Sequence, residues 1–447
     1  MPRKRSILLL IFASIILLGT TSNVFLYDQN KPETPTANIP WLGHEIFITL
    51  QEYGQDPEVA YNWKRAEYLV VWWTFEGIFG QRINSSGELV GPATFAISTG
   101  PKIRREPAVA YDPVNERYFV VWSHNVGSNG SPNYDLSGRL IPWDGPSNNY
   151  KEFKVNSFGS DQFEPKVAYN TADREFLTVW INGPYQQIYG VRVDAFNGSL
   201  LGAAKAISSV LDSAGTADVA FNPANGQYLV TWEKWVPNTA NINIYGIRLK
   251  GDDITVLGGG DFGIATWPDS ELYPAVAICK DANQYLVVWL SSANDDIFGR
   301  IVLGNGSLTS NVYHFRDTPR HVGSPDAACN TAGNLFLTVW QEQYTDASGP
   351  WGVWGSLVTP EGGGSICPGC RSNPETANAA DPTFEIIAPT TDDTQIEPAA
   401  AGGDDQYLVA WENSCSGTGC YSIHARIIYI LKEPPQFKYL PFISKEI

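Results

Sequence analysis

One unit of roughly fifty residues recurs seven times in this chain, and this repeat constrains the fold more than any other feature. Each copy contains a Pro-x-Val-Ala-Tyr segment, a Tyr-Leu-Val-Val-Trp segment and an Ile-Tyr-Gly-x-Arg segment. The first segment begins at Pro57, Pro107, Pro165, Ala217, Pro274, Pro325 and Pro398, and the second ends at Trp72, Trp122, Trp180, Trp232, Trp289, Trp340 and Trp411. Units repeated at this period stack on their neighbours, so the chain is expected to form one repeat domain despite its length.

The three segments have the composition of antiparallel β-strands. Residues 68–72 are apolar on both strand faces, which is typical of a central strand packed between two layers. Residues 59–61 and 78–82 predict shorter strands on either side, joined by turns rich in Asn, Asp, Gly and Pro. A fourth, weaker strand is expected in six copies, at residues 95–98, 153–156, 206–208, 262–265, 313–315 and 384–387.

The last copy lacks a fourth strand of its own, and a segment before the first copy has the same pattern. Residues 46–49 have the apolar-x-apolar-Ser/Thr form of the other fourth strands. We expect them to complete the last repeat, which would leave no open sheet edge. The predicted fold is all-β: a seven-bladed β-propeller with four antiparallel strands per blade, closed by its N-terminal strand.

The repeat resembles the repeat-built β-propeller proteins that many bacteria export, most of them without an assigned function. The resemblance covers Glu45 to about Leu431 and rests on packing positions, so it implies the fold and no activity. The segment from Tyr439 to Lys445 is similar to a short apolar tail on some exported bacterial proteins.

The N-terminal residues have the layout of a secretory leader. Basic residues at 3–5 precede an apolar run at 7–18 that only Ser14 interrupts. Because no clear cleavage site follows, an uncleaved anchor remains an alternative. The expected organisation is a leader or anchor at 1–25, a linker at 26–44, the propeller at 45–431 and a C-terminal tail at 432–447. Such a protein would be secreted or held at the cell surface, as a monomer.

The charge of the chain excludes one class of partner. Its formal net charge is -17, whereas binding to nucleic acid or to anionic membranes needs clustered Lys and Arg. Contact with a membrane is therefore expected only through an uncleaved leader. The acidity itself is expected mainly to keep a secreted surface soluble.

Residues that recur in every copy are expected to serve packing. The tryptophan that ends the second segment would wedge between neighbouring blades, and the glycine of the third segment would make room for it. The arginine that follows this glycine in six copies would be paired. These are Arg82, Arg139, Arg192, Arg248, Arg300 and Arg426. Residues that fail to repeat are therefore the better candidates for function.

The turn between the second and third strands varies in length, and in propellers it lies on the face that usually binds ligands. Aromatic side chains beside carboxylates in these turns suit a glycan, peptide or protein partner at the cell surface. The candidate ligand-binding residues are Trp235, Tyr134, Tyr185, Tyr344, Trp351, Glu233 and Glu412. The alternative is that these loops only pack on each other.

Four copies have an acidic residue directly before the first proline: Asp56, Glu106, Glu164 and Glu397. If the innermost strands begin here, the four carboxylates gather at the mouth of the central channel, where they could hold Ca²⁺ or receive a cationic group. The alternative is that an acidic residue before proline only favours extended backbone at the end of a turn. The sequence indicates no other cofactor.

Six cysteines in an exported chain favour disulfides. The spacing predicts two local bridges, Cys415–Cys420 and Cys367–Cys370, and the alternative is a zinc site built from the four thiolates. Cys279 and Cys329 fall on the first strands of neighbouring blades, where we expect two buried thiols rather than a bridge.

Catalytic motifs are absent from the sequence. Its five histidines show no metal-ligand spacing, and neither a nucleophile elbow nor the Asp-box motif of sialidase-like propellers occurs. The predicted function is therefore non-catalytic binding through the loop face. A polysaccharide-active hydrolase or lyase with a carboxylate pair near the channel mouth is one alternative, and a structural cell-surface protein is another.

Overall fold

The fold is known from a computed structural model. It describes residues 38–49, 53–128, 132–147, 149–183, 186–209, 212–237, 239, 241–293, 295–316, 320–330, 332, 335–344, 349–360, 383–389, 393–415 and 421–432. The expected leader and the C-terminal tail beyond Lys432 lie outside these ranges. Among the described residues, no helix has the length and apolar character needed to cross a membrane.

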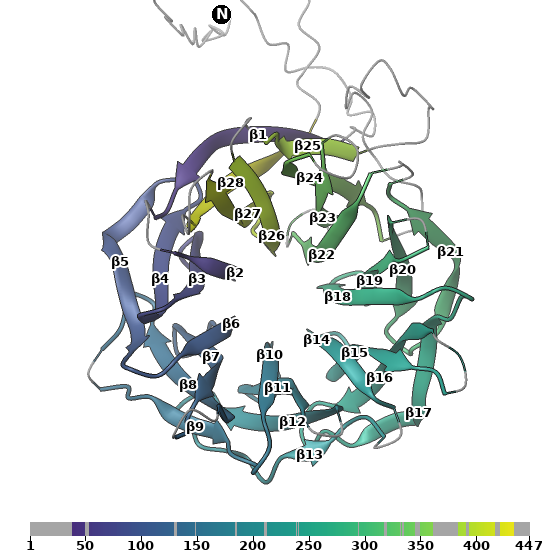
Figure 1. The fold of residues 1–447 in the computed structure, drawn as a ribbon, viewed down its shortest axis with the longest axis horizontal. Helices are drawn as coiled ribbons and strands as arrows, with labels where there is room; N and C mark the ends of the chain where they lie inside the picture. Colours follow the sequence, from purple (N-terminus) through teal and green to yellow (C-terminus); the bar gives the residue numbers. More distant parts are fainter. Residues whose placement is uncertain are drawn as a thin grey trace, which may run out of the picture. The chain divides into compact units, whose positions relative to one another are not determined.

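Seven four-stranded antiparallel sheets surround a common centre, as Figure 1 shows, and each sheet is one blade of a propeller. Blades one to three contain β2 (Gln55–Asn62), β3 (Glu67–Thr74), β4 (Gly77–Asn84) and β5 (Leu89–Thr99); β6 (Arg104–Asp112), β7 (Arg117–Asn125), β8 (Tyr134–Pro142) and β9 (Phe153–Asn156); β10 (Gln162–Asn170), β11 (Glu175–Asn182), β12 (Gln187–Asp194) and β13 (Lys205–Ala206). Blades four and five contain β14 (Ala214–Asn222), β15 (Gln227–Trp235), β16 (Ile242–Lys250) and β17 (Val256–Ala265); β18 (Glu271–Cys279), β19 (Gln284–Ser291), β20 (Asp296–Leu303) and β21 (Leu308–His314). Blades six and seven contain β22 (Val322–Cys329), β23 (Phe336–Gln343), β24 (Trp351–Val358) and β25 (Thr383–Ile387); β26 (Asp393–Gly402), β27 (Gln406–Cys415), β28 (Tyr421–Lys432) and β1 (Asn38–Phe47). The predicted fold class is confirmed.

The N-terminal strand β1 closes the ring as the outermost strand of blade seven, where it pairs antiparallel with β28. It begins earlier than expected, at Asn38, within the stretch predicted to be linker. The reason is that β28 is long enough to pair with residues 38–42 beyond a register shift between Leu42 and Glu45. Pro40 is tolerated here because an edge strand does not need every backbone N–H.

The apolar core is divided among the seven interfaces between blades. The tryptophan that ends the central strand is 0% exposed in all seven blades. In each case it packs with residues of the preceding blade; Trp122, for example, packs with Leu69 and Ile97 of blade one. The predicted wedge role of these residues, which we call the anchor tryptophans, is therefore confirmed. The recurring arginines are paired as expected, as in the ion pairs Arg82–Glu67 at 3.1 Å and Arg192–Glu175 at 2.9 Å.

The glycine of the third strand makes room for a different side chain from the one expected. A Cβ on Gly190 would stand 2.7 Å from Ile207, and one on Gly246 would stand 2.8 Å from Ile264. Both neighbours belong to the segment that follows the third strand, not to the anchor tryptophan. The glycine therefore lets the outer part of the blade pack closely against its third strand.

A polar contact beside the turn between the first and second strands joins neighbouring blades. Tyrosine hydroxyls at the start of the central strands lie beside an asparagine of the preceding blade, in the pairs Tyr118 with Asn62, Tyr228 with Asn170, and Tyr285 with Asn222. The same asparagines also cap their own turns; the Asn62 side chain, for example, accepts the backbone N–H of Lys64 at 3.2 Å. One side chain thus orders a turn and contacts the next blade.

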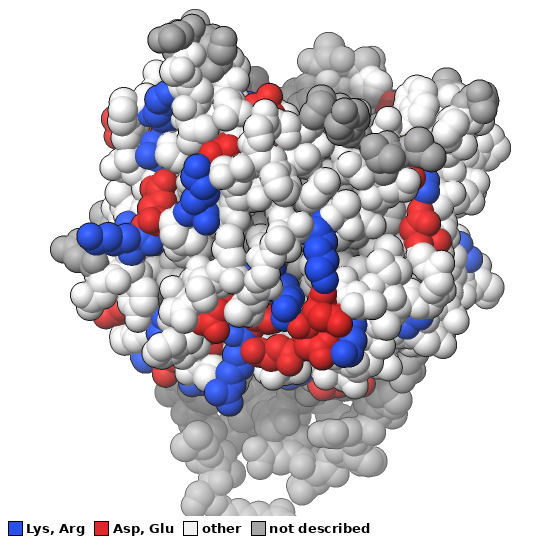
Figure 2. Space-filling view, turned by 90° about the horizontal axis from the view of Figure 1, so that it is seen from below, with Lys and Arg blue, Asp and Glu red and all other residues white. Residues whose placement is uncertain are grey.

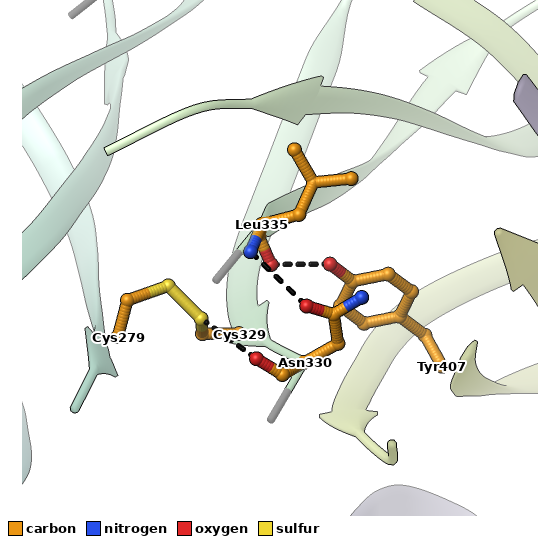
Figure 3. The surroundings of a disulfide bond; sticks show 5 residues. All are labelled: Cys279, Cys329, Asn330, Leu335 and Tyr407. Carbon is orange, nitrogen blue, oxygen red and sulfur yellow. Dashed lines mark hydrogen bonds between the residues drawn. A yellow bond between two sulfur atoms is a disulfide. The ribbon is translucent and has the colours of Figure 1, made fainter. Parts of the chain in front are cut away.

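The interface between blades five and six lacks this contact, because Cys279 replaces the asparagine and Phe336 replaces the tyrosine. Here Cys279 and Cys329 form a disulfide, with their Cα atoms 5.4 Å apart (Figure 3). The expectation of two buried thiols is therefore wrong. The register of the two first strands brings the cysteines together, and this proximity was not visible in either strand alone.

Candidate functional site: the channel mouth and loop face

The propeller has two faces with different connections. The loop face carries the turns between the second and third strands and the connections from one blade to the next. The opposite face, which we call the turn face, carries the turns between the first and second strands and between the third and fourth. The first strands line the centre of the ring (Figure 1) and run from the loop face to the turn face.

Every first strand begins with a β-bulge at the loop face. The pairing with the second strand shifts register at this point in all seven blades, for example between Gln55 and Glu58 and between Ile396 and Ala399. The six residues that precede the first proline have φ between +45° and +55°: Asp56, Glu106, Glu164, Tyr273, Ser324 and Glu397. The alternative that the acidic residues only favour extended backbone before proline is thus wrong. These residues have the left-handed backbone conformation of the β-bulge instead.

The four predicted mouth carboxylates lie close enough to influence one another. Glu106 accepts the backbone N–H of Glu164 at 2.9 Å and the Ser123 hydroxyl at 2.8 Å. Burial, reinforced by Glu106, raises the pKa of both Asp56 and Glu164. Burial also raises the pKa of Glu397, and Asp56 adds to this effect. The mouth therefore carries an acidic arc over the consecutive blades seven, one, two and three.

A second set of charged side chains lies further inside the central channel, at the residue that follows the first position of the Pro-x-Val-Ala-Tyr segment. Lys166 pairs with Glu58 from two blades away, and Asp218 and Asp326 also attract its ammonium group. Burial raises the pKa of Asp218 to about 6 and that of Asp326 to about 7. We call these four residues the channel cluster. Sequence reasoning missed it, although the position next to the proline was available as a signal.

The mouth carboxylates already have protein partners. The Trp73 indole donates to Asp56 at 2.6 Å, and the Thr216 hydroxyl donates to Glu164 at 3.1 Å. In the described part of the chain, no group of three or more His, Cys, Asp or Glu side chains is arranged to hold a metal ion. Binding of Ca²⁺ at the mouth stays a prediction.

Two of the predicted ligand-binding residues share a hollow on the loop face. Glu233 and Trp235, both on β15, line a space of about 280 Å³ together with Gln186, Ser213, Ala214, Gly215 and Ile242. Trp235 is 43% exposed. Glu233 is half-buried and accepts the backbone N–H of Tyr273 at 2.8 Å. Burial raises its pKa to about 7, so its carboxyl group is partly protonated at neutral pH.

This hollow belongs to blades three and four, and its wall does not repeat around the ring. A Cβ on Gly215 would stand 2.2 Å from the Glu233 carboxylate, so a larger residue there would displace this side chain. The lining residues Gln186 and Ser213 have φ of 47° and 43°. Sequence reasoning missed these lining residues, since none of them is aromatic or charged.

The other predicted ligand-binding residues do not join this hollow. Tyr134 is buried, with the Arg105 guanidinium 4.2 Å from its ring. Glu412 is also buried, and burial raises its pKa to about 8. Tyr344 is 41% exposed and Trp351 is half-buried at the start of β24, both in blade six. The loop aromatics are therefore dispersed over several blades.

Several sequence predictions lie outside the described residues. These are Tyr185 and the cysteines Cys367, Cys370 and Cys420; Cys415 is described only in its backbone. The two local disulfides therefore stay predictions.

Charge is mixed on the face turned to the viewer in Figure 2, where a group of acidic side chains is flanked by basic ones. Ion pairs such as Lys250–Asp252 at 2.8 Å on β16 and the turn after it have the same character. The channel mouth differs, because its carboxylates outnumber the nearby cations.

No protein-family model matches the chain, and no curated protein matches it either. Solved structures are similar at low identity. Polysaccharide lyase Uly1 is 10% identical with a TM-score of 0.50, over 87% of this chain and 99% of its own. A fungal alcohol oxidase in complex with copper is 10% identical with a TM-score of 0.50, over 88% of this chain and 77% of its own. The β-propeller domain of the Trilobed protease from Pyrococcus furiosus is 8% identical with a TM-score of 0.47, over 84% and 95%. At these identities the likeness concerns the fold alone, and the chain is a seven-bladed β-propeller.

Proposed function

We propose that the protein is an exported, non-catalytic propeller that binds a glycan in the loop-face hollow between blades three and four. The observation that carries this proposal is the pairing of Trp235, an exposed indole, with the Glu233 carboxyl group in one hollow. An indole face stacks on the apolar face of a sugar ring, and a carboxyl group bonds its hydroxyls. Gln186 and Ser213 add further polar groups to the same wall.

The partly protonated state of Glu233 favours a neutral sugar. A carboxyl group with a pKa of about 7 can donate as well as accept a hydrogen bond at neutral pH. Burial opposes its ionisation, so a ligand that needs a full negative charge at this place is disfavoured. We therefore expect a glycan without cationic groups, in preference to a basic peptide.

Export is supported by the disulfide between blades five and six. Cys279 and Cys329 are bonded, and such bonds persist mainly in oxidising compartments outside the cytosol. The acidic composition and the leader-like N-terminus agree with secretion or surface attachment.

A glycan array probed with the full chain tests the proposal. We expect binding to a defined group of neutral glycans, and a loss of about tenfold or more in affinity for Trp235→Ala. The matched control is Trp41→Ala, because Trp41 is 62% exposed on β1, away from the hollow. Silence on the array, or equal losses for both variants, would overturn the proposal. Binding to peptides or proteins alone would replace the glycan with the other class of partner.

A polysaccharide hydrolase or lyase is the second candidate, because the mouth holds paired carboxyl groups in unequal surroundings. Burial and Glu106 raise the pKa of Glu164, whose backbone N–H bonds Glu106. Such chemistry uses two carboxyl groups, one of them an acid with a raised pKa. Release of reducing ends or of unsaturated sugars from a polysaccharide panel would favour this candidate, provided that Glu164→Gln and Glu106→Gln each abolish the activity.

A further inference from the structure

A second hollow lies at the opposite end of the ring, where the first strands reach the turn face. Its volume is about 370 Å³, and it is lined by the ends of all seven first strands and by Trp63, which is 54% exposed. This volume falls within the range of small-molecule sites, roughly 300–1,000 Å³. None of the loop-face candidates lines it.

Two of the blades that line the hollow depart from the repeat. The last residue of the Pro-x-Val-Ala-Tyr segment is aromatic in blades one to four: Tyr61, Tyr111, Tyr169 and Phe221. In blades six and seven the same position holds Cys329 and Gly402, and the valine two residues earlier is replaced by Ala327 and Ala400. The lining thus carries aromatic side chains in blades one to four and small side chains in blades six and seven.

The wall of this hollow is firmly held. The aromatic rings of its large side pack on the central strands behind them, with ring centroids 4.8 Å apart for Tyr61 and Tyr68 and 5.0 Å apart for Phe221 and Tyr228. On the small side, Cys329 is bonded to Cys279 (Figure 3). A site with fixed walls binds without the entropic cost of ordering them.

The chemistry of the lining is uncharged. It contains aromatic, aliphatic and small side chains and no Lys, Arg, His, Asp or Glu, and its polar side-chain groups include the hydroxyls of Tyr61, Tyr111, Tyr169 and Thr171. The charges of the channel cluster, such as Lys166 and Asp326, stand further toward the loop face and do not line it. A charged ligand would find no opposite charge in this lining, whereas a flat uncharged ring would pack against the tyrosine rings and the alanines.

We propose that this turn-face hollow is a binding site for an uncharged aromatic small molecule, separate from the loop-face site. The flat side of the ligand would contact the small side chains of blades six and seven, and its edge would meet the aromatic residues of blades one to four. Trp63 would cover the ligand from the rim.

The uncharged fluorophore N-phenyl-1-naphthylamine is a suitable probe, titrated into the full chain. We expect saturable fluorescence enhancement with one site per chain. The double variant Ala327→Val/Ala400→Val introduces the valines that the other five blades carry at this position. It therefore reduces the volume of the hollow with a residue that the same backbone already holds in the other blades. We expect it to weaken probe binding by about tenfold, because the added methyl groups occupy space that the probe would fill. Trp63→Ala should also weaken binding.

Two controls separate this site from other apolar surfaces and from the loop face. Ala224→Val changes an exposed alanine that does not line the hollow, and Trp235→Ala alters only the loop-face site. Both should bind the probe like the unchanged protein, and the double variant should keep its thermal transition and its glycan binding. Absence of saturable binding, or binding unaffected by the double variant and by Trp63→Ala, would overturn the proposal. Neither result bears on the glycan site.

Discussion

At the scale of residues, two tryptophans three positions apart on β15 differ in their exposure to solvent. Trp232 is 0% exposed in the core between blades three and four, whereas Trp235 is 43% exposed beside the loop-face hollow. The first recurs in every copy and the second does not. Repetition therefore distinguishes a packing residue from a surface residue of the same type.

Truncating these two residues should separate stability from binding. We expect Trp232→Ala to lower the free energy of unfolding by about 3–5 kcal/mol, because it opens a large cavity in a closed interface. Trp235→Ala should leave it within about 0.5 kcal/mol. Denaturant unfolding followed by circular dichroism measures both; similar losses for the two variants would contradict the assignment of Trp235 to the surface.

The buried carboxyl group of Glu271 should make the stability of the fold depend on pH. It is 0% exposed at the start of β18, and burial raises its pKa to about 8. A backbone hydrogen bond from Trp267 lowers the pKa, but by less than burial raises it. The folded state therefore holds a proton that the unfolded state releases above its ordinary pKa of 4.5. Stability from this group is complete below that value and is lost as the pH rises toward and through 8.

Glu271→Gln should remove this dependence. We expect the variant to be roughly 1–3 kcal/mol more stable than the original protein at pH 8.5 and nearly equal to it at pH 4.5. Thermal unfolding at pH 4.5, 7.0 and 8.5 gives the comparison, with the exposed Glu76→Gln as the control. A difference that does not grow with pH would show that the residue is not protonated in the folded state.

The limits of sequence-based prediction are also clearest at this scale. The buried anchor tryptophans and paired arginines could be predicted, because a position that recurs seven times must suit the shared environment. The burial of Tyr134 and Glu412 could not, since it depends on neighbours such as Arg105 that differ from blade to blade. The disulfide was missed because its two cysteines meet only when neighbouring first strands are placed side by side.

At the scale of elements, the interface between β18 and β22 shows how one contact replaces another. Three other interfaces place a tyrosine hydroxyl beside an asparagine side chain, as Tyr118 and Asn62 do. Between blades five and six the disulfide Cys279–Cys329 occupies this place. It closes a loop of 50 residues, for which the chain-entropy estimate is about 4 kcal/mol.

Removing and then replacing this bond tests the equivalence. We expect Cys279→Ala/Cys329→Ala to lower the free energy of unfolding by about 2–4 kcal/mol. Adding the missing pair, as Cys279→Asn/Cys329→Ala/Phe336→Tyr, should restore on the order of 1 kcal/mol of this loss through a hydrogen bond. Equilibrium unfolding under oxidising conditions compares the three proteins. An unchanged stability in the double variant would mean that packing alone holds the interface.

At the scale of the whole molecule, the number of blades and the closure of the ring could be predicted from the sequence. Counting fourth strands placed β1 in blade seven, and the structure agrees. The start of β1 was misplaced, because Pro40 and the lack of alternation hide a strand whose partner lies at the other end of the chain. The two hollows were not predicted, since each is space left by residues of several blades.

The channel cluster draws on four blades and should respond to pH as a unit. Lys166→Met leaves Glu58, Asp218 and Asp326 without their shared cation. We expect a loss of roughly 2 kcal/mol at pH 8, where Asp218 and Asp326 are ionised, and a smaller loss at pH 5, which lies below their pKa values of about 6 and 7, so that protonation removes their repulsion. Thermal unfolding at the two values is the measurement, with the exposed Lys151→Met as the control. A loss that is equal at both values would contradict this account.

The bulges at the loop face have a consequence for how such a ring can diversify. Asp, Glu, Tyr and Ser all occupy the same left-handed position before the first proline. The backbone there is set by the bulge and not by the side chain it carries, so the side chain is free to vary. The loop-face rim thus offers variable side chains on a constant backbone. A new binding specificity could arise by substitutions at these positions alone, with every blade unchanged.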